Sequence, residues 1–248
     1  MTDLLLFQLR RVGRNKQYLF FTVLLPALFT IFFTRVFGAQ AGSSAQYQEW
    51  ARGYLVSMMA YGALGAALGA TIRLAFDRRS GWLRQLRVTP FPPGAVLAVD
   101  VLVGALLVLP SLVVVALVGR FVNDVQLGLG TWIALVGVLW IGAAAFVALG
   151  LALGLALDEQ AAGGAIGILS TVLAALGGLW VPVAVFPDGL AAVARAMPSY
   201  QYAQLGRDLV AGGAPAATSL VAVAGYGLAF AVLALAVGRR RPLHAVAG

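Results

Sequence analysis

Long apolar runs, each about the length of a membrane-crossing helix, recur from one end of the chain to the other. A helix needs about 20 residues to cross the ~30 Å hydrocarbon core of a bilayer. Of the 248 residues, 61% are hydrophobic and only 10% are charged, whereas an average soluble domain has roughly 25% charged residues. The sequence therefore predicts a single all-α membrane domain over residues 1–248. Its six predicted transmembrane helices cover residues 18–37, 53–76, 95–119, 131–157, 160–181 and 215–237.

Lysine and arginine are unevenly distributed between the predicted loops, and this asymmetry predicts the orientation of the spans. Twelve of the seventeen basic residues precede the first span, surround the loop at 77–94 or follow the last span. Short cytoplasmic loops carry such an excess of positive charge. An even number of spans places both termini on one side, so we expect both termini in the cytoplasm. Tryptophans fall at predicted outer ends of spans, as in an interfacial aromatic belt: Trp50, Trp132 and Trp180.

Residues 1–17 are predicted to form an amphipathic helix along the cytoplasmic membrane interface. Apolar side chains cluster on one helical face and polar side chains on the other, a pattern formed by Leu5, Leu6, Leu9, Val12, Gln8, Arg10, Arg11, Arg14 and Asn15. The alternative is a cleaved signal peptide that ends near the small residues Ala39 and Ala41. The apolar run that begins at Tyr18 is longer than most signal-peptide cores, which favours a retained first span.

The residues that the chain lacks exclude several classes of enzyme. A phosphate-binding loop needs a lysine within a glycine-rich turn, but the only lysine is Lys16, in the sequence RNKQY. The only histidine is His244 in the C-terminal tail, and there is no cysteine. The spans therefore offer no histidine or cysteine for a metal site or a nucleophile. We expect no enzyme active site, no metal and no cofactor in this chain.

Asp100 is the only acidic residue well inside a predicted span. Because a lone carboxylate at membrane depth is costly, we expect an ion pair with a basic residue near the cytoplasmic end of the second span, Arg73 first. A role in transport is the alternative. Ion-coupled transport would need several ionisable residues at mid-depth and a repeated fold, and the sequence shows neither. Tyr61 and Trp140 also lie near mid-depth, where they either line an apolar cavity or pack between helices.

Glycines within the predicted spans are spaced for close contact between helices. A G-x-x-x-G spacing lets two helix backbones approach closely because glycine has no side chain. Packing is therefore the predicted role of three pairs: Gly65 with Gly69, Gly150 with Gly154, and Gly163 with Gly167.

The loop at 77–94 reads DRRSGWLRQLRVTPFPPG and has a more ordered pattern than a charged loop requires. On a helical wheel Trp82, Leu83 and Leu86 share one face, and most of the polar side chains point elsewhere. Pro90 disfavours the helical conformation of the residue before it and so ends the helix. The sequence predicts a short amphipathic helix on the cytoplasmic surface. The simpler interpretation is a basic loop that only follows the positive-inside rule.

With this loop after the second of six spans, the chain resembles the permeases of type-2 ATP-binding-cassette exporters, which include bacterial drug, polysaccharide and lipid exporters. The resemblance covers essentially the whole chain. Two features depart from the family pattern, since Arg79 and Ser80 stand where glutamates are usual and Trp82 stands where threonine is common. The family's loop carries a glycine, a bulky residue, two leucines and a Thr/Ser-Pro pair, which here fall on Gly81, Trp82, Leu83, Leu86, Thr89 and Pro90.

The resemblance implies that this short helix couples the chain to a separate cytosolic ATPase subunit, which binds ATP and Mg²⁺. It also implies a second permease, either another copy of this chain or a homologue, and a pathway that involves the first, second and fifth spans. The expected location is the bacterial plasma membrane, in contact with lipid. No nucleic-acid partner is expected.

Residues 182–213 are predicted to form an external helical segment before the last span. Prolines at 182, 187 and 198 divide it into pieces too short to cross a membrane. Short helices that dip into the outer leaflet are therefore predicted over 189–196 and 200–211. Paired short external helices are a feature of the same family, and Pro198-Ser199-Tyr200 resembles its Pro-x-Tyr element.

These observations favour the transmembrane subunit of an ATP-driven exporter. Compact loops and apolar spans indicate a hydrophobic or amphiphilic small molecule, such as a drug or natural product, as the substrate. The first alternative is a polysaccharide or lipid exporter, and a polysaccharide exporter should show more polar and aromatic residues along its spans. The second is a non-transporting membrane scaffold or assembly factor that uses the same loop to bind a partner.

Overall fold

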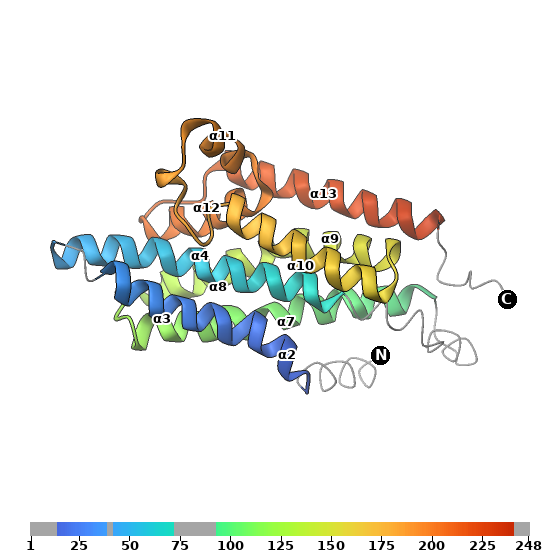
Figure 1. Cartoon of the computed structure of the whole chain (residues 1–248), viewed down its shortest axis with the longest axis horizontal. Coiled ribbons are helices and arrows are strands. Elements are labelled where there is room, and N and C mark those ends of the chain that lie inside the picture. The colour runs from blue at the N-terminus through green and yellow to red at the C-terminus, as the bar shows by residue number, and fades with distance from the viewer. Residues whose placement is uncertain (1–13, 39–41, 72–92, 241–248) are drawn as a thin grey trace.

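The computed structural model describes residues 14–38, 42–71 and 93–240, and this part of the chain is helical with no strand (Figure 1). The first helical stretch consists of α2 (Lys16–Leu19), the π-helical turn η1 (Phe20–Leu24) and α3 (Leu25–Gly38). The long helices that follow are α4 (Ser44–Ala70), α7 (Pro93–Phe121), α8 (Leu129–Gly142), α9 (Ala144–Ala156), α10 (Glu159–Leu176) and α13 (Ala217–Arg240). Between α10 and α13 lie η2 (Val183–Val185), α11 (Asp188–Ala196) and α12 (Pro198–Val210).

Five stretches of the described chain are helical, long and apolar enough to cross a membrane, so the chain is a multi-pass membrane protein. They are Lys16–Gly38, Ser44–Ala70, Ala98–Phe121, Leu129–Ala156 and Ala217–Arg240. The predicted span at 160–181 is instead the 18-residue α10, which ends earlier because Gly177 caps it and Gly178 has a positive φ of 68°. Such a helix rises roughly 27 Å, slightly less than the ~30 Å of a hydrocarbon core.

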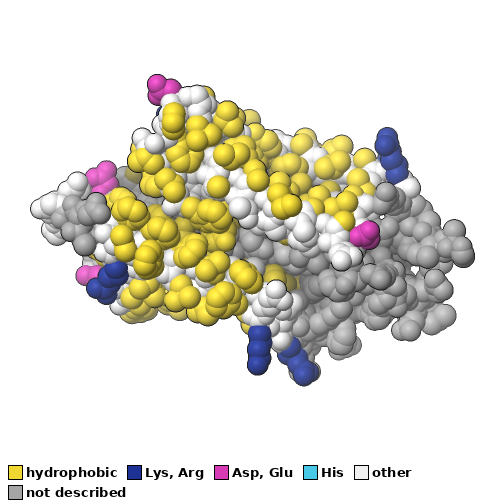
Figure 2. All heavy atoms as spheres, in the orientation of Figure 1, with side chains coloured by type: hydrophobic (Ala, Val, Ile, Leu, Met, Phe, Trp, Pro, Cys, Tyr) yellow, Lys and Arg dark blue, Asp and Glu magenta, His cyan; other side chains and the backbone are white. Residues whose placement is uncertain are grey.

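The helices run back and forth along the long axis of the molecule (Figure 1). α2, α7 and α10 begin, and α13 ends, at one end of the bundle, which we call the terminal end. α11 and α12 lie at the opposite end, and their bounds are close to the predicted 189–196 and 200–211. Figure 2 shows hydrophobic side chains spread over the face of the bundle and the few charged side chains at its periphery. This distribution is the one expected of a surface that faces lipid.

α4 forms the centre of the bundle, and α13 lies at its edge. Of the most apolar part of α4, 78% is buried, against 11% of that of α13. α4 packs against α3, α7, α9 and α12, whereas α13 packs mainly against α9. Large side chains of α13 point outward, including Val221, Leu228 and Leu235. α4 therefore positions the interior surfaces, and α13 offers an apolar face to lipid.

The first span, α4 and α7 meet closely at Gly62. Pro26 has no N–H to donate to the Thr22 carbonyl oxygen one turn earlier, and the Ser111 Oγ of α7 donates to that oxygen at 2.6 Å. A Cβ on Gly62 would overlap the Ser111 Oγ, and it would lie 3.1 Å from the Pro26 Cγ and 3.2 Å from the Thr22 oxygen. A glycine at position 62 therefore allows three helical segments to share one crossing point.

Gly62→Ala is expected to destabilise the protein by about 1–3 kcal/mol, because the added methyl overpacks this crossing. Gly65→Ala, one turn further along α4, is the matched control. Its Cβ would meet only the Thr22 Cγ2, at 3.9 Å, and alanine favours a helix over glycine by about 1 kcal/mol. Thermal unfolding of the two purified variants should give a lower Tm for Gly62→Ala alone. Equal Tm values would show that the crossing tolerates a side chain.

Candidate functional site

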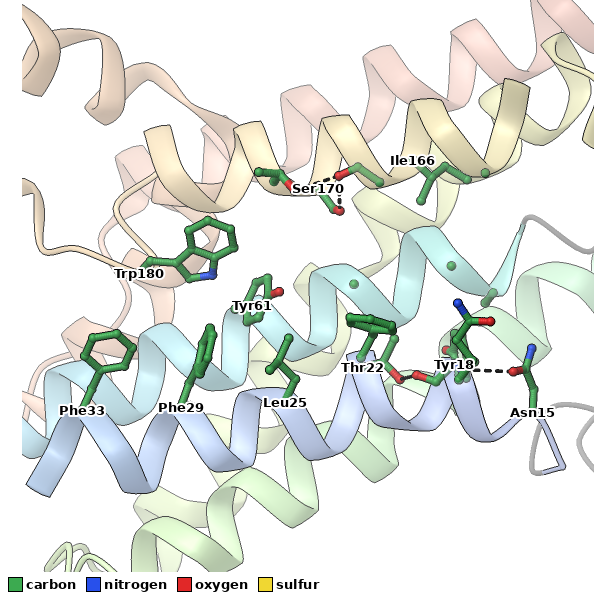
Figure 3. Close-up of a pocket in the computed structure, with 18 of the residues that line it drawn as sticks. Asn15, Tyr18, Thr22, Leu25, Phe29, Phe33, Tyr61, Ile166, Ser170 and Trp180 are labelled. Atoms are coloured by element: carbon green, nitrogen blue, oxygen red, sulfur yellow. Dashed lines mark hydrogen bonds between the residues drawn. The ribbon is translucent and has the colours of Figure 1, made fainter. Parts of the chain in front are cut away.

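A cavity of about 970 Å³ lies between the first span, α4 and α10. Each of the three helices contributes side chains three or four residues apart, so that each presents one face to the cavity (Figure 3). Its volume is within the range of about 300–1,000 Å³ that is usual for small-molecule sites. The main lining residues are Tyr18, Thr22, Leu25, Phe29 and Phe33 from the first span, Tyr61, Gly65 and Gly69 from α4, Gly163, Ile166, Gly167, Ser170 and Thr171 from α10, and Trp180.

The wall of this cavity is uncharged and mainly apolar. None of the described residues that line it carries a charge. Three of its hydroxyl groups are engaged by the backbone of their own helix. The Thr22 Oγ1 donates to the Tyr18 carbonyl at 2.8 Å. The Ser170 and Thr171 hydroxyls both donate to the Gly167 carbonyl, at 3.0 and 2.9 Å. Because these hydroxyls are already paired, the cavity offers dispersion and hydrophobic contacts to a ligand more than hydrogen bonds.

Aromatic rings close the cavity at the end near Trp180 (Figure 3). The Trp180 and Tyr61 rings meet edge to face, with centroids 5.5 Å apart, and Phe29 and Phe33 do the same at 5.6 Å. The Trp180 Nε1 is buried and makes no well-aligned hydrogen bond within the described residues, although it interacts with the hydroxyl of Tyr61. A buried donor without a partner is costly, so a molecule with a hydrogen-bond acceptor at this point would be favoured.

Gly163 and Gly167 open the cavity and pack against no other helix of the described chain. A Cβ on either residue would meet no described atom within 4 Å, so the predicted packing within the chain is wrong for this pair. Gly150, by contrast, packs as predicted, because its Cβ would overlap the Thr71 Oγ1 and lie 3.1 Å from the Leu68 Cα. The spacing is the same in both pairs, and only the tertiary structure decides whether a second helix covers the glycines.

The structure places the two predicted cavity residues differently. Tyr61 lines the cavity, but Trp140 is not among the lining residues. Trp140 lies on α8, is 37% exposed, and donates from its Nε1 to the Ala105 carbonyl of α7 at 2.8 Å. Asp100 is buried in α7 with 5% exposure. Its predicted partner Arg73 lies outside the described residues.

The predicted coupling residues also lie outside the described residues: Gly81, Trp82, Leu83, Leu86, Thr89 and Pro90. The same holds for residues 1–13 of the predicted interfacial helix. The structure adds α7 at this end. This helix begins at Pro93, within the last two residues of the predicted loop, and runs the length of the bundle.

Sequence reasoning missed most of the cavity wall. It placed Trp180 only in an interfacial belt, although this side chain closes the cavity. The signal in the first span is a face with a spacing of three to four residues, from Tyr18 through Leu25 to Phe33. A spacing of this kind predicts one buried face, and it does not distinguish a face that packs from a face that borders an empty volume.

Comparisons with known proteins point to one family. Residues 40–236 match the family model described as "ABC-2 family transporter protein". The chain is also 30% identical over 237 residues to the "Putative transport permease YvfS" of Bacillus subtilis (strain 168), and the alignment covers 94% of this chain and 95% of that protein. The matched range includes α4 to α12 and most of α13, and therefore two of the three helices that line the cavity.

Proposed function

Because this chain belongs to the ABC-2 family of transporter proteins, we propose that it is the transmembrane subunit of an exporter that moves a hydrophobic or amphiphilic small molecule out of the cell. The family indicates a membrane subunit that works with an ATP-binding subunit. In our proposal that partner is a separate cytosolic ATPase, which binds Mg²⁺ and ATP and hydrolyses it. A second copy of this chain, or a homologous permease, completes the membrane part.

The uncharged cavity between the first span, α4 and α10 is the observation that supports this proposal. A ligand inside it exchanges water for apolar side chains, which favours molecules with large apolar surfaces. A polysaccharide would bring many hydroxyl groups into a wall that is mainly apolar and whose Thr22, Ser170 and Thr171 hydroxyls are already paired. Each polar group left unpaired there would be costly. The buried Trp180 Nε1 offers one donor, which suits a mostly apolar molecule with a single acceptor.

The proposed arrangement in the membrane has six spans, with α10 as the fifth. α11 and α12 dip into the outer leaflet, and the terminal end of the bundle faces the cytoplasm of a bacterial cell. This orientation puts the start of α7, and the loop before it, on the side where an ATPase subunit is available. It also puts the cavity on the route between the two sides of the membrane.

Copurification followed by transport in vesicles tests the proposal. The tagged chain should copurify with an ATPase subunit from its native membrane. Inverted vesicles that contain the complex should take up rhodamine B, which carries both a carboxylate and a positive charge, only with ATP. ATP hydrolysis should rise in the presence of this amphiphilic dye. A hydrolysis rate that does not depend on the membrane chain would favour the scaffold alternative. Stimulation by oligosaccharides but not by dyes would favour polysaccharide export.

A further inference from the structure

A second, smaller pocket lies toward the end of the bundle opposite the terminal end. Its volume is about 290 Å³, and it is formed by the first half of α4, the segment 178–184 and α12. It shares no lining residue with the apolar cavity. Trp180 and Val181 face the cavity, while their neighbours Leu179 and Pro182 face the small pocket. One short segment of chain therefore separates the two volumes.

Arg207 supplies a positive charge to the small pocket. Its Nη2 donates to the Ser57 Oγ at 3.0 Å and to the Gly178 carbonyl at 3.2 Å. The guanidinium also lies 5.4 Å from the centre of the Tyr200 ring. A guanidinium has five N–H donors, and here its Nε and Nη1 donate to no described residue. These two nitrogens are available to a ligand.

No carboxylate of the described chain pairs with Arg207. The neighbouring Asp208 accepts its hydrogen bonds elsewhere, at its Oδ1 from the Gln204 Nε2 at 2.7 Å and at its Oδ2 from the Ala216 N–H at 2.8 Å. Burial lowers the pKa of Arg207, and the nearby negative charge of Asp208 opposes this effect. An arginine stays protonated in proteins. The pocket therefore contains a partly buried cation that Asp208 stabilises at a distance and that makes no direct ion pair within the described residues.

Glu49 also lines this pocket and is the only acidic residue among those that do. It precedes Ser57 by eight residues on α4, which is roughly 12 Å along the helix axis. Glu49 forms no ion pair with Arg207, because the hydrogen bond to Ser57 keeps the guanidinium about two turns of α4 away from Glu49. One pocket thus has a cation toward one side and a carboxylate toward the other.

The Tyr54 hydroxyl is a second group of this pocket that is able to form a hydrogen bond with a ligand. Tyr54 lines the same pocket, is 5% exposed, and its hydroxyl is buried without a hydrogen bond within the described residues. Its ring stacks on Trp50, with centroids 5.0 Å apart and planes 7° from parallel. Tyrosine hydroxyls are usually paired when buried. A ligand with more than one oxygen atom could pair with this hydroxyl and with the free nitrogens of Arg207, because both residues line the pocket.

We propose that this pocket binds the anionic group, a carboxylate or a phosphate, of an amphiphilic molecule, through charge-assisted hydrogen bonds from Arg207 and a hydrogen bond from Tyr54. The pocket is large enough for a head group and the first carbons of a chain, and Trp50 and Tyr200 supply apolar contact. Glu49 lies toward the other side of the pocket, where it would favour a positive group on a zwitterionic ligand. Where the bound molecule is the exported one, this inference rests on the proposed function. A phospholipid head group is the other source of the same chemistry.

Binding of hexyl phosphate tests the proposal on the full chain without its partner subunit. The purified chain in phosphatidylcholine nanodiscs should bind hexyl phosphate in saturation-transfer NMR, and it should not bind hexylammonium, which has the same tail and the opposite charge. Tyr54→Phe should weaken hexyl phosphate binding by about tenfold, because it removes a charge-assisted hydrogen bond. Its Tm should stay equal or rise, since the hydroxyl it removes is unpaired.

The charge is tested by Arg207→Gln, which should abolish binding of hexyl phosphate. Arg195→Gln makes the same change of charge on the exposed surface of α11 and should leave binding unchanged. Arg207→Lys keeps the charge and should retain part of the affinity if Arg207→Gln fails to fold. Equal binding of hexyl phosphate by the wild type and by Tyr54→Phe would overturn the proposal, as would equal binding of hexylammonium.

Two further measurements separate the two sources of the ligand. Native mass spectrometry of the chain from its own membrane should show a bound phospholipid that Tyr54→Phe loses, if the source is lipid. Stimulation of ATP hydrolysis by hexyl phosphate in the complete complex, lost in Tyr54→Phe, would indicate an exported molecule. If the chain binds hexyl phosphate in a manner that depends on Tyr54 but exports nothing, the proposed function is disproved and the proposed binding site still stands.

Discussion

Gly167→Leu is expected to reduce export about tenfold or more, while the fold, membrane insertion and ATPase binding stay normal. Position 167 lies on the face of α10 that lines the cavity, and a Cβ there would meet no atom within 4 Å. A leucine side chain therefore enters the volume that the exported molecule needs. Misfit of even one methylene changes the selectivity of an apolar site by about 10–200-fold. The helix itself should gain stability, because leucine is a better helix former than glycine.

Gly225→Leu is the matched control for this prediction. Gly225 lies in α13 at the edge of the bundle, and a Cβ there also meets nothing within 4 Å, but this residue does not line the cavity. The measurement is ATP-dependent uptake into inverted vesicles of a dye that the wild-type complex transports, with Tm recorded for both variants. Normal uptake by Gly167→Leu would show that the exported molecule does not pass through this cavity.

Much of the helical architecture could be predicted from the sequence, because apolar runs and proline positions act locally. Pro187 and Pro198 delimit α11 and α12 within two residues of the predicted helices. The end of α10 was less predictable. The apolar pattern continues past Leu176 to Val181, but the helix stops at Gly177 because the positive φ of Gly178 turns the chain. An apolar pattern does not show this turn.

The cavity and the small pocket could not be predicted because both depend on contacts between distant parts of the chain. Arg207 counts in the sequence as one of five basic residues on the outer side. Nothing local shows that it turns inward, since it bonds Ser57, 150 residues away, and Gly178, 29 residues away. In the same way the Thr22 carbonyl that Pro26 leaves without a donor is paired by Ser111, 89 residues further on. Sequence periodicity shows which face of a helix is buried, but it does not show which other helix packs against that face.

Trp82→Ala together with Leu86→Ala is expected to abolish transport and weaken ATPase binding, while the membrane domain stays folded and inserted. With Leu83, these side chains form the apolar face of the predicted coupling helix at 77–94. Burial of a few hundred Å² of that face in a groove of the ATPase is worth several kcal/mol at about 25 cal/mol per Å², before ordering costs. Large central aromatic side chains dominate such interfaces, so Trp82 should contribute most.

The described part of the chain shows how motion at this helix would reach the cavity. α7 begins at Pro93 and stays helical through Ser111, although Pro110 removes one of its backbone hydrogen bonds. The Ser111 Oγ is bonded to the carbonyl of Thr22, and Thr22 lines the cavity. A shift of α7 along its axis therefore changes the wall that faces the exported molecule. These contacts give a physical basis for coupling between the loop and the cavity. Coupling is established only when the effect of a change at the loop is measured at the cavity.

A control on the polar face separates loss of docking from a general disturbance of the loop. Ser80→Ala with Arg84→Gln changes two residues that point away from Trp82 and Leu86 on the helical wheel, so ATPase binding and dye uptake should stay close to wild type. Fluorescence-detected size exclusion reports folding, a pull-down reports ATPase binding, and vesicle uptake reports transport. If the Trp82 and Leu86 double variant binds the ATPase normally and transports at the full rate, the loop only supplies positive charge. Motion of the ATPase must then reach α7 through another contact.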